Sequence, residues 1–458
     1  MLSKIIKKTI AAILLVLPAM VCNSQNEIMV ENYFSTEYSI MRETTRGELL
    51  LFNHSMKHGG YFVLLDNSSS SYLIAMTPGL FVNDMEIVAN NAYFCGTLNG
   101  NPVSGFFGIT ALFYASGQIT YFAIPSTLTC PLNQNDNEYI TSLDKLEVID
   151  FGGNNHLVMV GDASCTHTGT TNRCIVEIYK SGIPWIIAYQ PEHGGVFHYD
   201  DIAITSTEIA IVGNKNGSYG EYISTYNIPT IYTNMFIATL GNINTYGYGG
   251  AGYALYPTSK VIAENIPGTS LFATVCKANR STSSNPIDAT FFNLYSSVGN
   301  SIYRCFIDDY CGLNYRELKY NSSTNSFMLL MDSCGGVYEY GYYEFELDNT
   351  MSMVTNVYYH HNNSLIRILS LDKMEHGTVG QQCALSGKDP NANYLSIWRH
   401  DATQQQYCSS TYIVPQRQNN QSTGVFDFDC PDYYSLITPT YLTPTKIEEI
   451  TLTTKCAE

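Results

Sequence analysis

The sequence predicts an all-β protein assembled from repeated hairpins, and three observations support this. An apolar strand, a Gly- or Asn-rich turn and a second apolar strand return many times along the 458 residues. Side chains suited to a pleated, half-buried surface are abundant, with 36 Tyr and 20 Phe. Beyond residue 25 the sequence has no long run with apolar residues at i, i+3, i+4 and i+7, so long helices are not expected.

The hairpin repeat predicts the architecture. Successive copies begin about 55 residues apart, which is the length of one four-stranded sheet with its loops. Small sheets of this kind bury their faces by packing against one another in a closed ring, a β-propeller. Counting copies predicts seven four-stranded blades, with six and eight as neighbouring alternatives. The copies span residues 47–65, 92–109, 156–178, 208–226, 270–294, 326–347 and 378–400.

Three glycines recur at the end of the second strand of a repeat, namely Gly96, Gly161 and Gly213. A glycine inside a strand marks a bend or a close approach of another backbone. We interpret these residues as structural, at places where strands crowd the centre of the ring.

Residues 1–24 have the composition of a secretory signal peptide. Lys4, Lys7 and Lys8 precede a short apolar stretch at 10–21, and small residues near Ser24 allow cleavage there. The stretch is too short to span a bilayer comfortably, so no transmembrane span is expected in the mature chain. The protein is therefore expected to be exported, to the periplasm, the cell surface or the medium. The alternative is lipid anchoring at Cys22, which the preceding Val21 disfavours.

The rest of the chain is divided into three parts. Residues 25–36 are expected to be a flexible N-terminal segment and residues 37–421 the propeller. Residues 422–458 do not copy the blade pattern well. This C-terminal segment is expected to close the ring or to cover an exposed strand edge, which would otherwise invite aggregation.

The cysteine count fits an oxidising compartment. Of 13 cysteines, one lies in the leader and an even number remains, so disulfides are expected. Short spacing suggests two bridges, Cys165–Cys174 and Cys305–Cys311, and a third between Cys430 and Cys456 would tie down the C-terminal segment.

The net charge limits the partners. The chain has 40 acidic and 23 basic residues and a formal net charge of −17. Such a surface repels phosphate backbones, so nucleic acid is not an expected partner.

Familiar catalytic signatures are missing from the sequence. It has no GxSxG elbow, no HExxH, no P-loop and no GxGxxG between a strand and a helix. No metal site and no cofactor are predicted, and an enzyme is the less favoured reading. The richest polar cluster is the segment 191–201, where His193, His198 and Asp200 have the chemistry of metal ligands or of an acid/base pair. A solvated loop between two blades is the favoured interpretation of that segment.

Tyrosine placement gives another hint of binding. Tyr246, Tyr248 and Tyr253 stand among glycines in a stretch of loop composition at 244–256. Aromatic rings on loops offer contact area at low entropic cost, with a polar tip. A glycan or a protein or peptide ligand would suit them. The alternative is that these rings pack over a blade edge.

The blade rhythm, the leader and the Tyr- and Asn-rich turns resemble those of secreted β-propeller proteins of Gram-negative bacteria. The resemblance carries over no functional residue. The expected function is that of a binding or interaction protein at or outside the cell envelope. The alternative is a carbohydrate-active hydrolase or lyase with its site at the central channel. Acids and His from three or more blades, converging at the channel mouth, would favour that enzyme.

Overall fold

The computed structural model describes most of the chain, in segments that follow the predicted strands. The described residues are 27–30, 36–55, 59–65, 71–115, 117–124, 128–129, 137–151, 154–165, 171–180, 184–189, 197–205, 208–215, 221–227, 244–247, 253–255, 261–282, 285–296, 301–308, 315–331, 341–362, 367–376, 381–388, 395–401, 408–413, 416–417, 424–426, 432–436, 438–451 and 453–455.

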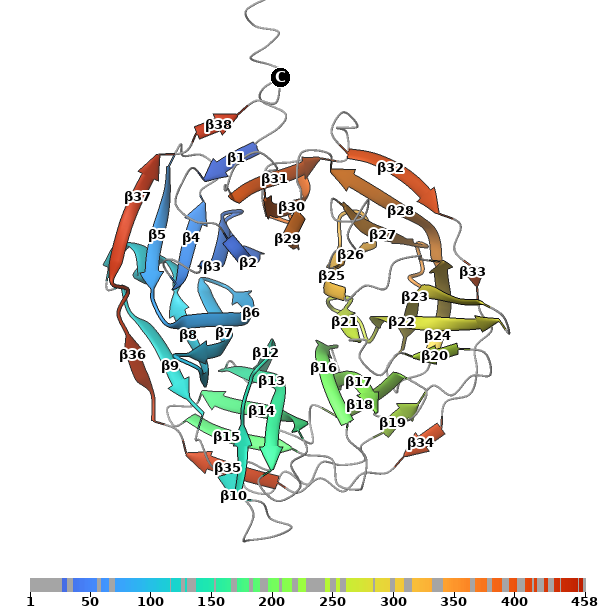
Figure 1. The fold of residues 1–458 in the computed structure, drawn as a ribbon, viewed down its shortest axis with the longest axis horizontal. Coiled ribbons are helices and arrows are strands. Elements are labelled where there is room, and N and C mark those ends of the chain that lie inside the picture. Colours follow the sequence, from blue (N-terminus) through green and yellow to red (C-terminus); the bar gives the residue numbers. More distant parts are fainter. Residues whose placement is uncertain are drawn as a thin grey trace, which may run out of the picture.

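The described strands form seven antiparallel sheets, which stand around a common centre as in a β-propeller (Figure 1). The all-β prediction is confirmed. We number the sheets in chain order and give the strands of each from the centre outwards. The first sheet has β2 (Thr36–Glu43), β3 (Leu49–Ser55), β4 (Gly59–Leu65) and β5 (Ser71–Thr77); the second has β6 (Leu80–Val88), β7 (Asn91–Leu98), β8 (Asn101–Gly108) and β9 (Ile119–Ala123); the third has β12 (Lys145–Phe151), β13 (Asn154–Cys165), β14 (Thr171–Lys180) and β15 (Pro184–Tyr189); and the fourth has β16 (Phe197–Ile204), β17 (Glu208–Lys215), β18 (Glu221–Asn227) and β19 (Asn244–Gly247). The fifth sheet has β21 (Ile262–Asn265), β22 (Phe272–Thr282), β23 (Asn285–Tyr295) and β24 (Ser301–Asp308); the sixth has β25 (Tyr315–Asn321), β26 (Ser326–Met331), β27 (Gly341–Leu347) and β28 (Val354–Asn362); and the seventh has β29 (Arg367–Lys373), β30 (Gln381–Lys388) and β31 (Leu395–Asp401).

A few short elements complete these sheets. In the third sheet β11 (Asn137–Ile140) pairs with the far end of β13, and β10 (Leu128–Thr129) pairs with β11. In the fifth, β20 (Tyr253–Leu255) extends the line of β21 along β22. A short π-helical turn, η1 (Ala111–Ala115), precedes β9. Across the described part of the chain, no helix has the length and apolar character needed to cross a membrane.

The innermost strands of the sheets pack against one another in ring order. β2 contacts β6, β6 contacts β12, β12 contacts β16, and the sequence continues through β21, β25 and β29 back to β2. We call these seven the inner strands. Because they meet at the centre, residues far apart in the sequence can share one site there.

The outer edges of the sheets are covered by a C-terminal segment. One segment, residues 408–455, runs around the outside of the ring and adds an outermost strand to every sheet (Figure 1). We call this segment the strap. Its strands and their partners are β32 (Cys408–Ile413) on β28, β33 (Gln416–Arg417) on β24, β34 (Gly424–Phe426) on β19, β35 (Asp432–Leu436) on β15, β36 (Thr440–Leu442) on β9, β37 (Lys446–Thr451) on β5 and β38 (Thr453–Lys455) on β1 (Glu27–Val30).

The two ends of the described chain meet in one sheet. β1 pairs with β31 on one side and with β38 on the other, so an N-terminal strand completes the last sheet and the strap covers it. Five of the sheets therefore hold four strands plus one from the strap, and the third and fifth sheets also hold the short strands described above. The strap takes up the outer edges that would otherwise be free to pair with another chain. It begins before residue 422, the predicted start of the C-terminal segment.

Local turn chemistry fits these hairpins. Asn99 and Gly100 connect β7 to β8 and both have positive φ, at 52° and 84°. Asn-Gly is the preferred pair for such a two-residue turn, because its twist matches that of the flanking strands.

The recurring glycines lie where an inner strand approaches its neighbour. A Cβ on Gly96 would overlap the carbonyl oxygen of Phe81, and a Cβ on Gly161 would overlap that of Ser142. Gly213 pairs with Tyr199 next to a bulge in β16. The predicted close approach of backbones is confirmed at Gly96 and Gly161.

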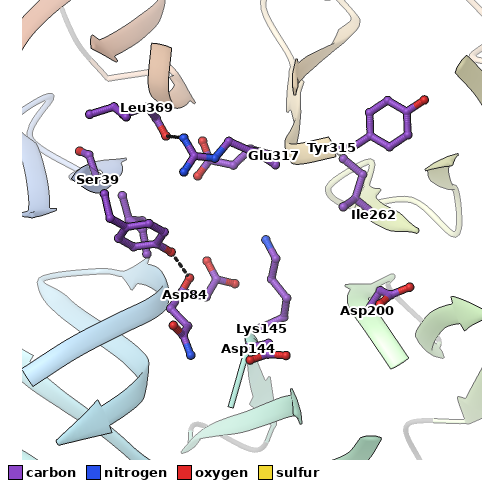
Figure 2. Close-up of a pocket in the computed structure, with 13 residues that line it drawn as sticks. Ser39, Asp84, Asp144, Lys145, Asp200, Ile262, Tyr315, Glu317 and Leu369 are labelled. Carbon is purple, nitrogen blue, oxygen red and sulfur yellow. Dashed lines mark hydrogen bonds between the residues drawn. The ribbon is translucent and has the colours of Figure 1, made fainter. Parts of the chain in front are cut away.

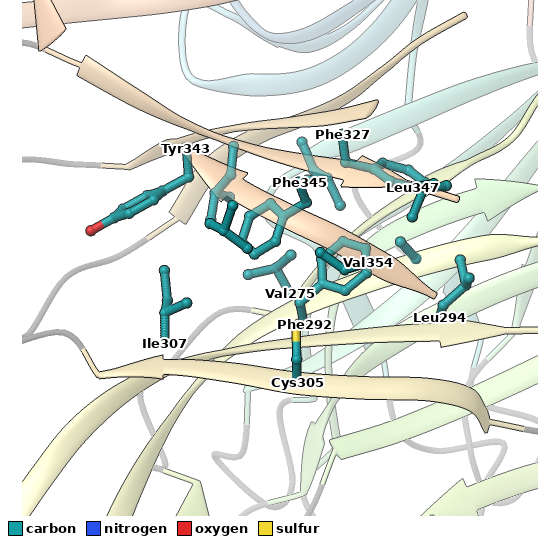
Figure 3. Packing of buried hydrophobic residues seen from close by; sticks show 14 of the residues in the cluster. Val275, Phe292, Leu294, Cys305, Ile307, Phe327, Tyr343, Phe345, Leu347 and Val354 are labelled. Carbon is teal, nitrogen blue, oxygen red and sulfur yellow. The ribbon is translucent and has the colours of Figure 1, made fainter. Parts of the chain in front are cut away.

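The hydrophobic core lies between neighbouring sheets. Between the fifth and sixth sheets, Phe292 stacks on Phe345 with ring centroids 4.7 Å apart and meets Phe327 edge-on at 5.6 Å (Figure 3). All three rings are fully buried. Burying such a side chain stabilises the fold by about 1.5–3 kcal/mol, so face-to-face packing of sheets is a large favourable contribution.

The cysteines differ from the predicted bridges. Cys305 is a free thiol, fully buried in the cluster of Phe292 (Figure 3), and Cys311 lies outside the described residues. In the ladder of β13 and β14, Cys174 stands opposite Gly161, four positions from Cys165, which corresponds to about 13 Å along a strand. A disulfide needs a shorter separation, so this backbone register does not favour the predicted Cys165–Cys174 bridge. Cys430 and Cys456 lie outside the described residues.

Candidate functional site

A cavity of about 310 Å³ lies among the inner strands at the centre of the ring (Figure 2). All seven inner strands contribute to its wall, β12 also through the residue just before it. We call this cavity the channel mouth. Its lining residues are Tyr38, Ser39, Ile40, Asn83, Asp84, Asp144, Lys145, Asp200, Ile262, Tyr315, Arg316, Glu317 and Leu369.

Carboxylates on the inner strands accept backbone hydrogen bonds from the neighbouring sheet. Asp84 Oδ2 accepts the backbone N–H of Leu146 at 3.1 Å, and Asp201 Oδ2 accepts that of Ala263 at 3.0 Å. The same contact recurs where Glu317 Oε2 accepts the N–H of Leu371 at 2.7 Å. An innermost strand has no further strand to pair with, and a buried unpaired N–H is costly. The acids therefore have a structural role.

Arg42 on β2 joins two of these acids across the centre. Its Nη2 lies 2.8 Å from Asp84 Oδ1 and its Nη1 lies 3.1 Å from Glu317 Oε1. Nη1 also donates to the carbonyl oxygen of Met41 at 2.8 Å. The three charged side chains are almost fully buried. Charge-assisted hydrogen bonds of this kind are about twice as strong as neutral ones, and they fix the first, second and sixth sheets relative to one another.

Around the rim, polar side chains link adjacent sheets in the same way. Tyr38 Oη donates to the carbonyl oxygen of Asn83 at 2.7 Å, and Asn83 Nδ2 donates to that of Leu143 at 2.6 Å. Arg316 Nη1 donates to the carbonyl oxygen of Leu369 at 2.9 Å, and its guanidinium lies 5.9 Å from the centre of the Tyr38 ring. Figure 2 shows the two bonds from Tyr38 and Arg316 as dashed lines. The wall of the cavity is thus held rigidly.

The acids differ in their tendency to hold a proton. Burial favours the neutral form of Asp84, but the charges of Lys145 and Arg42 outweigh burial and lower the pKa of this carboxyl. Burial raises the pKa of Asp201 and Glu264, and burial together with Glu86 and Glu264 raises the pKa of Glu147 well above its usual range. Asp201, Glu264 and Glu147 line a much smaller cavity of about 10 Å³ beyond the mouth.

Lys145 has hydrogen-bond donors that no described residue accepts. Its side chain extends into the cavity (Figure 2), and it makes no hydrogen bond and no close ion pair with any residue that the structure describes. Burial disfavours its charge, but the carboxylates of Asp201, Asp84 and Glu317 outweigh burial and raise the pKa of Lys145. The ammonium group therefore stays charged, with three N–H donors facing the cavity.

Of the residues that the sequence singled out in the segment 191–201, the structure brings one to the site. Asp200 is buried in β16, lines the channel mouth and accepts the N–H of Val261 at 3.1 Å. The prediction of a solvated loop is wrong for 197–201, because these residues form an inner strand. His198 also lies in β16, and His193 lies outside the described residues. Over the described part of the chain, no three His, Cys, Asp or Glu residues are grouped to hold a metal ion.

Two of the three tyrosines predicted to lie in a loop belong to strands. Tyr246 lies in β19, between Ile223 of β18 and Val425 of the strap strand β34. Tyr253 lies in β20, opposite Arg280. Both residues lie in paired strands, so the loop prediction is wrong at these two positions. Tyr248 lies outside the described residues.

The main residues of the channel mouth were not singled out from the sequence. Their shared signal is a charged residue placed at every second position of the first strand of a repeat. Examples are Asp84 with Glu86, Lys145 with Glu147, and Glu317 with Lys319. Such alternation is typical of a half-exposed strand, so it did not by itself separate a channel from an outer surface.

No protein-family model and no curated protein matches this chain. Among solved structures, three chains match. One is the β-propeller domain of Cps50 (Swd1) from Myceliophteria thermophila, with 7% sequence identity and a TM-score of 0.42. The alignment covers 82% of this chain and 99% of that chain.

Proposed function

We propose that the chain is an exported, seven-bladed β-propeller that acts as a binding protein at or outside the cell envelope, with its ligand site at the channel mouth. The observation that carries this proposal is the cavity itself. Its volume of about 310 Å³ lies at the lower end of the range for small-molecule sites, and every inner strand supplies part of the wall. Side-chain hydrogen bonds between neighbouring sheets hold that wall in place, so the site is already formed before a ligand binds.

The chemistry of the acids favours binding over catalysis. A general acid needs a pKa near the working pH and access to the substrate. Asp84 and Glu317 face the larger cavity, but Arg42 and backbone N–H groups hold both of them. Three acids with a raised pKa, Glu147, Asp201 and Glu264, line a cavity of about 10 Å³, which is too small for a sugar ring.

One observation supports the enzyme alternative, a carbohydrate-active hydrolase or lyase. Acids from three inner strands converge at the channel mouth, namely Asp84, Asp200 and Glu317. Incubation with a library of glycans, followed by product analysis, tests this alternative. Turnover that is lost in Asp200→Asn and retained in Asp348→Asn, a change in an exposed turn, would establish the enzyme and displace the binding protein.

Blocking the mouth tests the binding proposal. Asp144 lies at the cavity wall and is partly exposed, so Asp144→Trp should obstruct entry. Thr350→Trp, in the exposed turn between β27 and β28, is the matched control. Binding to arrays of glycans and peptides should disappear in the first variant and persist in the second. Binding that survives in Asp144→Trp would contradict the proposed location.

Export is supported by the charged and apolar pattern of residues 1–24 and by the start of β1 at Glu27, just beyond the proposed cleavage near Ser24. N-terminal sequencing of the protein recovered from cell fractions tests it. A mature chain that begins near Gln25 is expected. A retained leader, or a fatty acid that is lost in Cys22→Ala, would contradict soluble export.

A further inference from the structure

We infer that Lys145 is the ligand-directed group of the channel mouth and that the site takes an uncharged, oxygen-rich ligand, such as one unit of a neutral glycan. This inference rests on the proposed binding function and names its ligand class. It follows from which hydrogen-bonding groups of the cavity are already used and which remain.

The carboxylates at the mouth have partners. Both oxygens of Asp84 are taken, by Arg42 and Met85 N–H on one side and Leu146 N–H on the other. Both oxygens of Glu317 are taken as well, by Arg42 on one side and by Ser370 and Leu371 on the other. The carboxylates of Asp84 and Glu317 therefore already have hydrogen-bond partners within the protein. A cationic ligand would also be repelled by the ammonium group of Lys145. An amine or a polyamine is disfavoured.

The field around Lys145 disfavours an anion too. The cavity is lined by Asp84, Asp144, Asp200 and Glu317, against two cations, Lys145 and Arg316. A carboxylate or phosphate would gain one contact with Lys145 while lying in a net negative site. Removing such a group from water without full compensation is costly.

A neutral ligand rich in hydroxyl and carbonyl oxygens suits both conditions. Its oxygens can accept from the free donors of Lys145, and its hydroxyl groups can donate to the remaining lone pairs of the carboxylates, each of which has about four acceptor positions. The partly exposed ring of Tyr38, which also lines the mouth, adds apolar surface for the C–H groups of a sugar ring. These features together favour a sugar over a peptide side chain.

The test is calorimetric titration of the full mature chain with the best neutral oligosaccharide from a glycan array, alongside an acidic oligosaccharide and spermidine as charged probes. Wild type should prefer the neutral glycan. Lys145→Met should weaken that binding at least tenfold. Lys373→Met is the matched control, because this lysine lies 3.5 Å from Glu375 and does not line the mouth, and its affinity should stay within twofold of wild type.

Unchanged melting temperatures in both variants would show that the loss comes from the site and not from the fold. An array without a neutral glycan ligand, a preference for a charged probe, or full affinity in Lys145→Met would each overturn the inference. If a peptide binds instead and Asp144→Trp blocks it, the channel mouth stands as the binding site and only the ligand class fails. If ligands bind equally well to Lys145→Met and Asp144→Trp, both proposals fail.

Discussion

The guanidinium of Arg42 lies 2.8 Å from the carboxylate of Asp84, so a residue of the first sheet is bonded to one of the second at the centre of the ring. Glu317 of the sixth sheet holds the same guanidinium at 3.1 Å. These three side chains tie the first two sheets to the sixth, which is distant from them in the sequence, and they support the wall of the channel mouth.

Replacing Arg42 should therefore be severe. Arg42→Met leaves two buried carboxylates without their cation, and breaking a buried pair in this way costs about 3–5 kcal/mol. We expect a loss of that size in the free energy of unfolding, measured by denaturant titration. Arg46→Met, at an exposed position four residues away in the turn after β2, should change stability by less than about 0.5 kcal/mol. Similar losses in the two variants would contradict the role given to Arg42.

Asp372 should make stability depend on pH. Burial raises the pKa of this carboxyl to about 7, above its usual value of 3.8, despite the opposing charges of Arg42 and Lys319. The native state then binds more protons than the unfolded state between about pH 4 and pH 7, so stability falls as the pH rises through that window. Asp372→Asn removes this titration and should flatten the profile.

Unfolding measured at pH 4.5 and pH 8 compares the two slopes. The control is Asp348→Asn, in an exposed turn, where hydrogen bonds from Thr350, Met353 and Ser352 hold the pKa low despite the small opposing effect of burial. Its titration lies below the window, so its profile should keep the slope of wild type. An Asp372→Asn profile as steep as that of wild type would rule out this contribution.

Gly96→Ala should destabilise the second sheet. The added Cβ overlaps the backbone of Phe81 at the inner strand, and neither strand can move away without disturbing its neighbours. Overpacking of this kind costs roughly 1–3 kcal/mol. In Gly108→Ala the new Cβ meets its nearest atom at 3.5 Å, an ordinary contact, so stability should change little. Thermal unfolding of both variants compares them directly, and equal melting temperatures would contradict the close approach.

Removing part of the strap should weaken the ring. Deleting residues 438–458 takes away β36, β37 and β38 and leaves the outer edges of β9, β5 and β1 unpaired. We expect a melting temperature lower by several degrees and concentration-dependent light scattering, because open edges pair with other chains. Deleting only residues 457 and 458 serves as the control. A truncated chain that melts like wild type and stays monomeric would show that the strap is dispensable.

Cys305 should behave as an unreactive free thiol. Burial raises its pKa to about 12, and the side chain is fully enclosed in the core. Alkylation of the native protein should spare Cys305, whereas alkylation after unfolding without a reductant should label it, as peptide mass spectrometry would show. Labelling that requires a reductant would instead favour the bridge to Cys311.

Several features of the fold were predictable because their causes are local. Alternation of apolar residues, turns such as Asn99-Gly100 and glycines such as Gly96 act over a few residues, and all of them are visible in the sequence. The strap was harder to predict. Apart from β32, its strands pair with partners more than 100 residues away, as Lys455 does with Glu27, and no local pattern specifies such partners. Tyr246 lies in a stretch of loop composition, yet it belongs to a strand that pairs with the strap strand β34.

The sequence by itself determined the kind of unit, a hairpin-based sheet that repeats and that must bury both faces against its neighbours. Only the tertiary structure decided which residues share a site. Closing the ring brings Asp84, Lys145 and Glu317 to one cavity although they lie far apart along the chain. The physical reason is that strand formation depends on neighbouring residues, whereas convergence at a centre depends on how all the sheets pack together.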